Sequence, residues 1–163
     1  MKRNTLTFLF MFLLFGLFTL SCSDDSPTEV PEFGSISGTV SFTGTWPAAG
    51  DIQVSIYAPL TPPYVPTGAP LAFTDPIASG VNTYDFNFEG LEKTEYGAIF
   101  VSWRDPANPA ASKLLGMYWT DATDAGINVQ TGLPTAQPST ITIDDDNIDV
   151  TGANLTANLD LAQ

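Results

Sequence analysis

Histidine is absent from this chain, and cysteine occurs once, at Cys22. Without histidine the chain cannot use Ser-His-Asp or Cys-His catalysis, His-ligated zinc or the usual near-neutral general base. Any enzyme would have to rely on paired carboxylates, on a serine with a lysine, or on tyrosine. A lone cysteine also excludes the paired thiols from which exported domains form stabilising disulfides.

Basic residues are also scarce, because five Lys and Arg stand against 18 Asp and Glu and give a formal net charge of −13. Phosphate binding requires a basic surface that releases counterions, so a nucleic-acid partner is excluded. The chain contains 13 Gly and 13 Pro at short intervals, and these residues interrupt long helices. The composition therefore favours a domain built of β-strands.

The longest apolar run lies near the N-terminus, at residues 6–20, directly after Lys2 and Arg3. A transmembrane helix needs about 20 apolar residues, whereas the apolar part of a secretory signal needs only about 7 to 15. A polar, acidic segment follows the run at once. The pattern predicts a cleaved signal peptide.

The residues up to Cys22 resemble the lipobox of bacterial lipoproteins, which reads Leu, Ala or Ser, Gly or Ala, then Cys. Here the positions are Thr19, Leu20, Ser21 and Cys22; Ser21 is suitably small, and Thr19 and Leu20 depart from the pattern. The resemblance implies a signal peptide at residues 1–21 and lipid on the Cys22 thiol. It implies an outer-membrane lipoprotein of the bacterial cell envelope, facing the periplasm or the cell surface. Stable anchoring takes more than one acyl chain, which mature bacterial lipoproteins carry.

Residues 22–33 are acidic, contain proline and have little to bury, which predicts a flexible tether. Residues 34–163 are expected to form one domain, since the mature chain has 163 − 21 = 142 residues. Cleavage also removes Lys2 and Arg3, and the net charge becomes −13 − 2 = −15. Such a charge keeps a domain soluble close to a membrane.

Alternation of apolar and polar residues predicts about seven strands with turn signals between them. Residues 95–104 are apolar on both faces, which predicts a central strand. Prolines exclude residues 59–70 from the interior of a sheet. Together these features predict an all-β fold, an antiparallel Ig-like sandwich. The strands are expected at residues 35–43, 52–57, 84–89, 95–104, 114–119, 140–143 and 154–161.

Three stretches share a further pattern: SISGTVSFTG at residues 35–44, DIQVSIYA at 51–58 and YDFNFEGLEKTEYGAIFVSW at 84–103. They resemble the carboxypeptidase regulatory-like or prealbumin-like (transthyretin-like) sandwich family. Thr94 departs from the family, which usually has Gly there, and the loop at residues 59–70 is long. The resemblance implies a noncatalytic accessory module, and no active-site residues come with it.

The acidic run near the C-terminus supplies oxygen ligands of the kind that calcium prefers. The calcium candidates are Asp144, Asp146 and Asp149. The run lacks the glycine and the distal glutamate of an EF-hand loop, and a solvated hairpin turn is the favoured alternative. No cofactor is expected.

Trp46 and Tyr64 lie in predicted turns or loops and could form a stacking platform for sugar rings. The other two tryptophans, Trp103 and Trp119, lie in predicted strands, where packing within the sheet or core is the favoured interpretation. A surface lipoprotein that binds carbohydrate is therefore one alternative function. Another is a transthyretin-like oligomer that binds a ligand and pairs through an edge strand.

Two groups of residues raise the question of catalysis. Glu89, Glu92 and Glu95 could supply an acid and a base for glycoside hydrolysis, and Ser112 with Lys113 could form a serine-lysine dyad. A solvated turn accounts for the glutamates, and the wider sequence context of a dyad is missing. The sequence therefore predicts a noncatalytic, lipid-anchored structural or interaction module, whose partner would be an envelope protein or a glycan.

Overall fold

The computed structural model describes residues 32–163, and these are mostly β-structure, with two short 3-10 helices and no α-helix. No helix among them is long and apolar enough to span a membrane. Cys22, the predicted signal peptide and the predicted tether up to residue 31 lie outside the described residues. The elements are β1 (Phe33–Thr43), β2 (Asp51–Tyr57), β3 (Ala72–Phe73), β4 (Thr83–Glu92), β5 (Glu95–Tyr96), β6 (Ala98–Arg104), η1 (Pro109–Ala111), β7 (Lys113–Met117), β8 (Ile141–Thr142), β9 (Asp149–Val150), β10 (Leu155–Asn158) and η2 (Leu159–Ala162).

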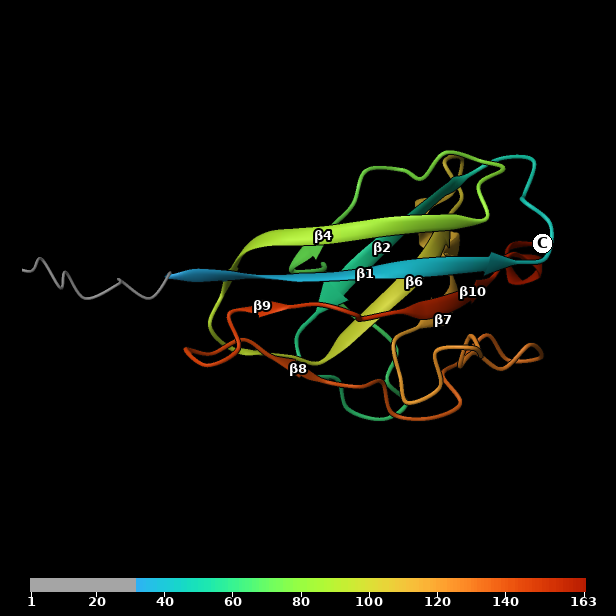
Figure 1. Ribbon diagram of the computed structural model, residues 1–163. Coiled ribbons are helices and arrows are strands. Elements are labelled where there is room, and N and C mark those ends of the chain that lie inside the picture. Colours follow the sequence, from blue (N-terminus) through green and yellow to red (C-terminus); the bar gives the residue numbers. More distant parts are fainter. Residues whose placement is uncertain (1–31) are drawn as a thin grey trace, which may run out of the picture.

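The first sheet has β1 at its centre, with β4 on one side and β9 and β10 on the other (Figure 1). β1 and β4 are antiparallel, and Ile36 lies opposite Phe88. The apolar positions of the alternating pattern, such as Ile36 and Val40, are fully buried, while polar residues occupy the opposite face. The prediction of strands with one buried face is confirmed here.

The predicted antiparallel arrangement is wrong for one edge of this sheet. β9 and β10 both run parallel to β1, with Ile36 opposite Val150 and Val40 opposite Leu155. They follow one another along the same edge of β1, and Ala153 between them donates its backbone N–H to Ser37. Alternating apolar residues bury one face equally well in parallel and antiparallel pairs, so the pattern could not reveal the direction.

The second sheet is antiparallel throughout, in the order β3-β2-β6-β7. β6 is an inner strand of this sheet, and side chains on both of its faces are buried: Val101 on one face and Phe100 on the other. The predicted central strand is therefore confirmed for β6. Its expected first part is a separate strand, β5, which pairs with β8 in a small third sheet.

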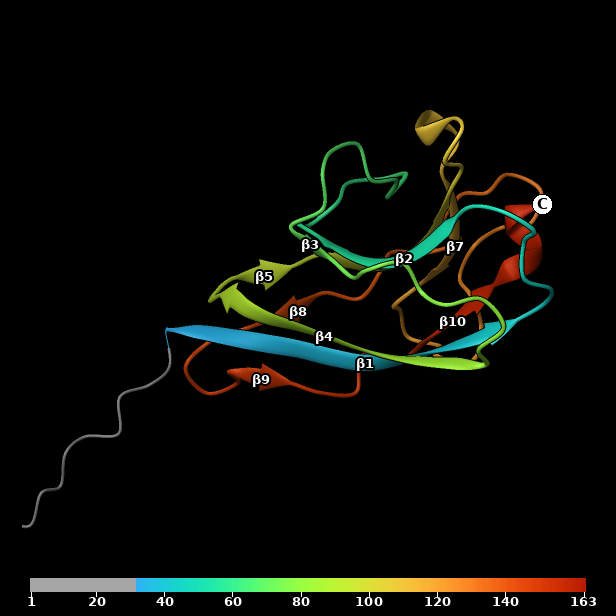
Figure 2. The same cartoon turned by 90° about the horizontal axis from the view of Figure 1, so that it is seen from above.

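Two hydrophobic clusters explain why β6 is apolar on both faces. The larger cluster contains inward-facing residues from both four-stranded sheets, which form two layers in Figure 2, together with residues of β5, β8 and η2. The smaller cluster lies on the outer face of the second sheet, where residues from the long loops between β2 and β3 and between β7 and β8 cover the strands. Its buried members are Ala98, Phe100, Met117 and Ile127.

The predicted strand at residues 154–161 is shorter in the structure. β10 ends at Asn158, and η2 follows directly. The Asn158 side chain accepts a hydrogen bond from the backbone N–H of Asp160 at 3.1 Å, which favours a turn over a continued strand. Leu159, which the alternating pattern placed in a strand, is buried at the start of η2.

Candidate functional site

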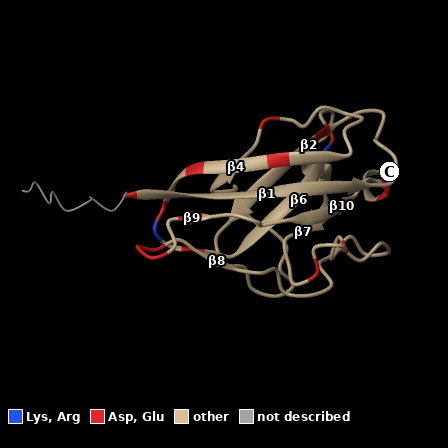
Figure 3. Ribbon diagram, viewed as in Figure 1, with Lys and Arg blue, Asp and Glu red and all other residues tan. Residues whose placement is uncertain are grey.

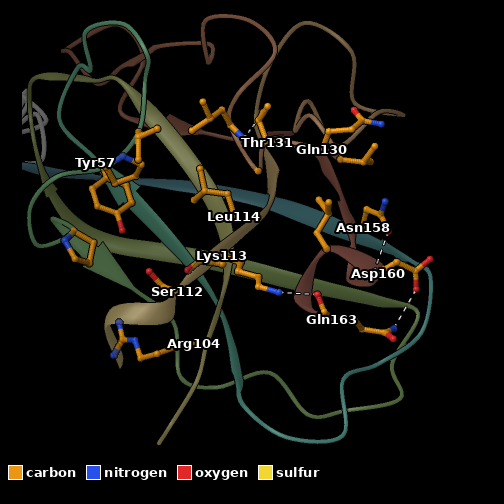
Figure 4. A pocket seen from close by; sticks show the side chains of 18 of the residues that line it. Tyr57, Arg104, Ser112, Lys113, Leu114, Gln130, Thr131, Asn158, Asp160 and Gln163 are labelled. Carbon is orange, nitrogen blue, oxygen red and sulfur yellow. Dashed lines mark hydrogen bonds between the residues drawn. The ribbon is translucent and has the colours of Figure 1, made fainter. Parts of the chain in front are cut away.

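A groove of about 900 Å³ lies on the outer face of the second sheet. Two loop segments, residues 65–70 and 129–133, line it, and residues of η2 line one end. Figure 4 shows Arg104, Ser112 and Lys113 along one side of this groove and Gln130 and Thr131 along the other. No predicted site brought these segments together.

The floor of the groove follows from strand alternation. Ser102 lies opposite Leu114, so both side chains emerge on the same face of the sheet. Tyr57 ends β2 on that same face, where its ring meets Phe100 of the smaller cluster with the two ring centroids 6.1 Å apart. The floor therefore combines a hydroxyl, an aliphatic side chain and a phenol.

The loop at residues 129–133 presents apolar side chains to the groove. The Asn128 side chain accepts hydrogen bonds from the backbone N–H groups of Gln130 and Thr131, and the Asn128 N–H donates to the Leu133 carbonyl. Val129 is 61% exposed and Leu133 is 41% exposed. Across the groove, Val65, Pro66 and Pro70 of the other loop also line it.

Two of the three basic residues that follow the predicted cleavage site line this groove. Lys113 donates to the backbone oxygen of Gln163 at 2.7 Å and lies 5.7 Å from the centre of the Trp103 ring. Arg104 is exposed, and no carboxylate of the described residues lies within salt-bridge distance of it. The third, Lys93, pairs with Asp145 at 2.6 Å in another part of the molecule. Figure 3 shows how much more numerous the acidic residues are.

Tyr57 remains a neutral phenol at physiological pH. Burial raises the pKa of Tyr57 above its ordinary value of 10.0, while the Ser55 side chain and the nearby Arg104 charge act in the opposite direction. The hydroxyl can therefore donate and accept hydrogen bonds at the groove floor.

Asp160 is an acidic residue of the groove, and hydrogen bonds within the protein fix the position of its carboxylate. Its carboxylate oxygen accepts a hydrogen bond from the backbone N–H of Thr45 at 2.9 Å and one from the Gln163 side chain at 3.5 Å. These contacts join η2 to the turn between β1 and β2. Asp160 therefore has a structural role at the end of the groove.

The structure does not gather the three calcium candidates into one site. Asp144 accepts hydrogen bonds from the backbone of Asp146 and Asn147, whereas Asp149 accepts one from the Ser35 hydroxyl. Among residues 32–163 no group of three or more carboxylate or thiol side chains is arranged to hold a metal ion.

The acidic run forms a turn, but the predicted hairpin is wrong. β8, before the turn, pairs with β5, whereas β9, after it, pairs with β1. The turn therefore connects two different sheets.

The two predicted stacking aromatics have different surroundings. Trp46 donates its indole N–H to the Val81 carbonyl at 3.2 Å and packs on Phe42, with the ring centroids 5.0 Å apart and a tilt of 52°. Tyr64 is half-buried and its hydroxyl lies 3.5 Å from the Gln137 side-chain oxygen. Trp46 is therefore engaged with the core.

The structure shows the surroundings of the residues considered for catalysis. Glu89 accepts a hydrogen bond from Asn87, and Glu92 and Glu95 are exposed. Lys113 extends to Gln163 and makes no hydrogen bond with Ser112.

Comparisons of the chain with protein-family models, with curated proteins and with solved structures find no match.

Proposed function

We propose that this protein is a noncatalytic binding module, held at the bacterial outer membrane by lipid on Cys22, and that the groove is its binding site. The observation that carries this proposal is the groove itself, where Arg104 and Lys113 lie beside exposed aliphatic side chains on an acidic chain. Binding sites characteristically combine apolar surface with a few polar groups that orient the ligand.

The position of the groove supports a role in binding at a membrane surface. β1 begins at Phe33 at one end of the domain, and η2, which lines the groove, lies at the other end (Figures 1 and 2). A tether that joins the domain at Phe33 leaves η2 on the side away from the anchor. A partner in the envelope would then have access to the groove.

We further propose that the fold is a variant of the prealbumin-like sandwich. In support of this, inward-facing residues of two four-stranded sheets share one hydrophobic cluster, as expected for face-to-face sheets. The parallel edge formed by β9 and β10 is the main difference from the antiparallel arrangement expected from the sequence.

The anchor is tested by the mass of the protein extracted from membranes. We expect a chain that begins at Cys22 and carries acyl groups, and we expect Cys22→Ser to abolish the acylated form. Ser23→Ala, one residue further on, is the matched control and should remain acylated. A chain beginning at any other residue, or a mass without acyl groups, would contradict the proposed anchor.

A second candidate function, a transthyretin-like oligomer, is favoured by the edge strand β3. This outer strand of the second sheet ends with Phe73, which is 62% exposed, and Leu71 directly before the strand is 57% exposed. An unpaired edge with exposed apolar side chains is a template for pairing with another chain, although the two residues of β3 limit the length of such pairing. Light scattering of the mature chain should then show a dimer or larger species that Phe73→Ser converts to a monomer. A monomer at high protein concentration would exclude this function.

A further inference from the structure

We propose that the groove binds an extended, acidic peptide segment of a partner protein, whose carboxylates contact Arg104 and Lys113 while its aliphatic side chains pack against the two loops. This inference rests on the proposed function of the groove as a binding site. It adds the chemical class of the ligand.

Charge complementarity supplies the first argument. Arg104 offers five N–H donors and has no carboxylate of the described residues within 4.0 Å. Lys113 uses one of its three donors on Gln163, which leaves two for a ligand. Asp160 is the one carboxylate side chain of the lining, and its oxygen already accepts hydrogen bonds from Thr45 and Gln163. Among the described residues outside the groove, Lys93 is the only basic one, so the surface there is dominated by carboxylates that repel an acidic segment. An acidic ligand is therefore attracted to the groove and disfavoured at other sites, which gives specificity as well as affinity.

The apolar side chains of the two loops supply the second argument. Val129 and Leu133 of one loop are 61% and 41% exposed, while Val65 and Pro66 line the groove from the other loop. Burying such side chains against a ligand removes apolar surface from water, at about 25 cal/mol per Å². A ligand with aliphatic groups beside its carboxylates would satisfy both parts of the groove.

The mixed lining favours a peptide over other anions. Sites for small molecules are mostly apolar and enclose the ligand, whereas interfaces with proteins combine polar and apolar surface. Ser102, Thr131 and Asn158 supply hydroxyl and amide groups that can pair with peptide N–H and C=O groups. The one aromatic ring of the lining is Tyr57, which is half-buried at the floor, so little ring surface is available for stacking on a sugar.

The probe is a phage-displayed library of random nonapeptides. The target is the chain of residues 22–163 with Cys22→Ser and biotin at the N-terminus, which precedes Phe33, where β1 begins at the end of the domain opposite η2. We expect the selected peptides to be enriched in Asp and Glu next to Val, Leu or Ile. A selected peptide should bind about five- to tenfold more weakly to Arg104→Gln and to Lys113→Gln, as expected for close charge pairs that become partly desolvated.

Lys93→Gln is the matched control, because it changes the net charge by the same amount at a distant ion pair. It should leave peptide affinity unchanged, and thermal unfolding of each variant verifies that it is folded. Replacing the Asp and Glu of a selected peptide by Asn and Gln should weaken binding by a similar factor.

Three outcomes would overturn the inference: no enrichment, selected peptides without carboxylates, or equal weakening by Lys93→Gln. Polygalacturonate, an acidic glycan, is tested in parallel. If it binds and the peptides do not, and Arg104→Gln and Lys113→Gln abolish that binding, the groove remains a binding site but the peptide class is wrong. Because the target carries no lipid, failure of the proposed anchor leaves this test unaffected.

Discussion

Arg104, Lys113 and Tyr57 give the groove its chemical character, and each obtains its position from a strand end. Arg104 closes β6 and Lys113 opens β7 at one end of the second sheet, whereas Tyr57 closes β2 at the opposite end, beside Ala98. A cation at the end of the sheet stays in contact with water, which limits the desolvation cost that a charge within the sheet would carry. The same position leaves its donors accessible to a ligand.

Tyrosine ionisation gives a prediction at this scale. Burial is the main cause that raises the pKa of Tyr57 and of Tyr96 above 10.0, so the folded state favours the neutral phenol. The contribution of these raised pKa values to the stability of the folded state is complete at a pH below the tyrosine pKa of the unfolded chain. It is lost as the pH rises through the higher tyrosine pKa of the folded chain. We expect the unfolding free energy from urea titrations to fall more steeply above about pH 10 in the wild-type chain than in a Tyr57→Phe, Tyr96→Phe variant. Equal slopes would contradict the raised pKa values.

At the scale of elements, the contact between β7 and β10 closes one side of the domain. These strands belong to different sheets and approach closely because Gly116 has no side chain. A Cβ atom at Gly116 would collide with the backbone oxygen of Thr156 and crowd the Cα atom of Ala157. Glycine is required at this position by a close approach between two backbones.

Gly116→Ala should therefore destabilise the domain by about 1–3 kcal/mol, the range typical of overpacking. Gly68→Ala is the matched control, because a Cβ atom at Gly68 would meet nothing within 4 Å. The control should lose no stability. The measurement is the midpoint and slope of chemical unfolding for both variants, and equal stability of the two would show that β7 and β10 do not pack this closely.

At the scale of the whole molecule, two layers of sheet exclude water from one large cluster and two long loops cover a second, smaller one. Leu115 faces the large cluster and is fully buried, whereas Leu71 lies beside the edge strand β3 and is 57% exposed. Because both side chains are leucines, a comparison of the same substitution at the two positions shows how much burial contributes to the unfolding free energy.

Leu115→Ala should lower the unfolding free energy by about 2–5 kcal/mol, since it removes buried methyl groups and leaves a cavity. Leu71→Ala should change it by less than about 0.5 kcal/mol. Urea unfolding followed by tryptophan fluorescence checks both values. Similar losses for the two variants would contradict the assignment of the core.

Net charge gives a second prediction for the whole molecule. The chain carries a formal net charge of −13, and the predicted cleavage before Cys22 would make it −15. Such a charge repels itself more strongly in the folded state than in the expanded unfolded chain. Adding salt screens this repulsion, and the screening length falls to about 10 Å at 0.1 M. We expect the thermal midpoint at pH 7 to rise as sodium chloride increases from low concentration to about 0.1 M. A constant or falling midpoint would contradict net repulsion.

The sequence by itself determined the β class, the one-sided strands and the central strand of the second sheet. These features depend on local alternation and on proline and glycine, whose effects act within a few residues. Residues 59–70 contain no strand, as their prolines predict. The acidic character and the lack of histidine chemistry also follow from composition alone.

Three features were decided only by the tertiary structure. They are the parallel direction of β9 and β10 relative to β1, the connection of two different sheets by the acidic turn, and the formation of the groove. Each depends on contacts between segments far apart in the chain: Tyr57, Lys113 and Val129 line one groove because two loops fold over one sheet face. Local patterns contain no information on such pairing, since alternation specifies which face is buried and not against what it packs. The scarcity of Lys and Arg was the one signal in the sequence that could have directed attention to Arg104 and Lys113.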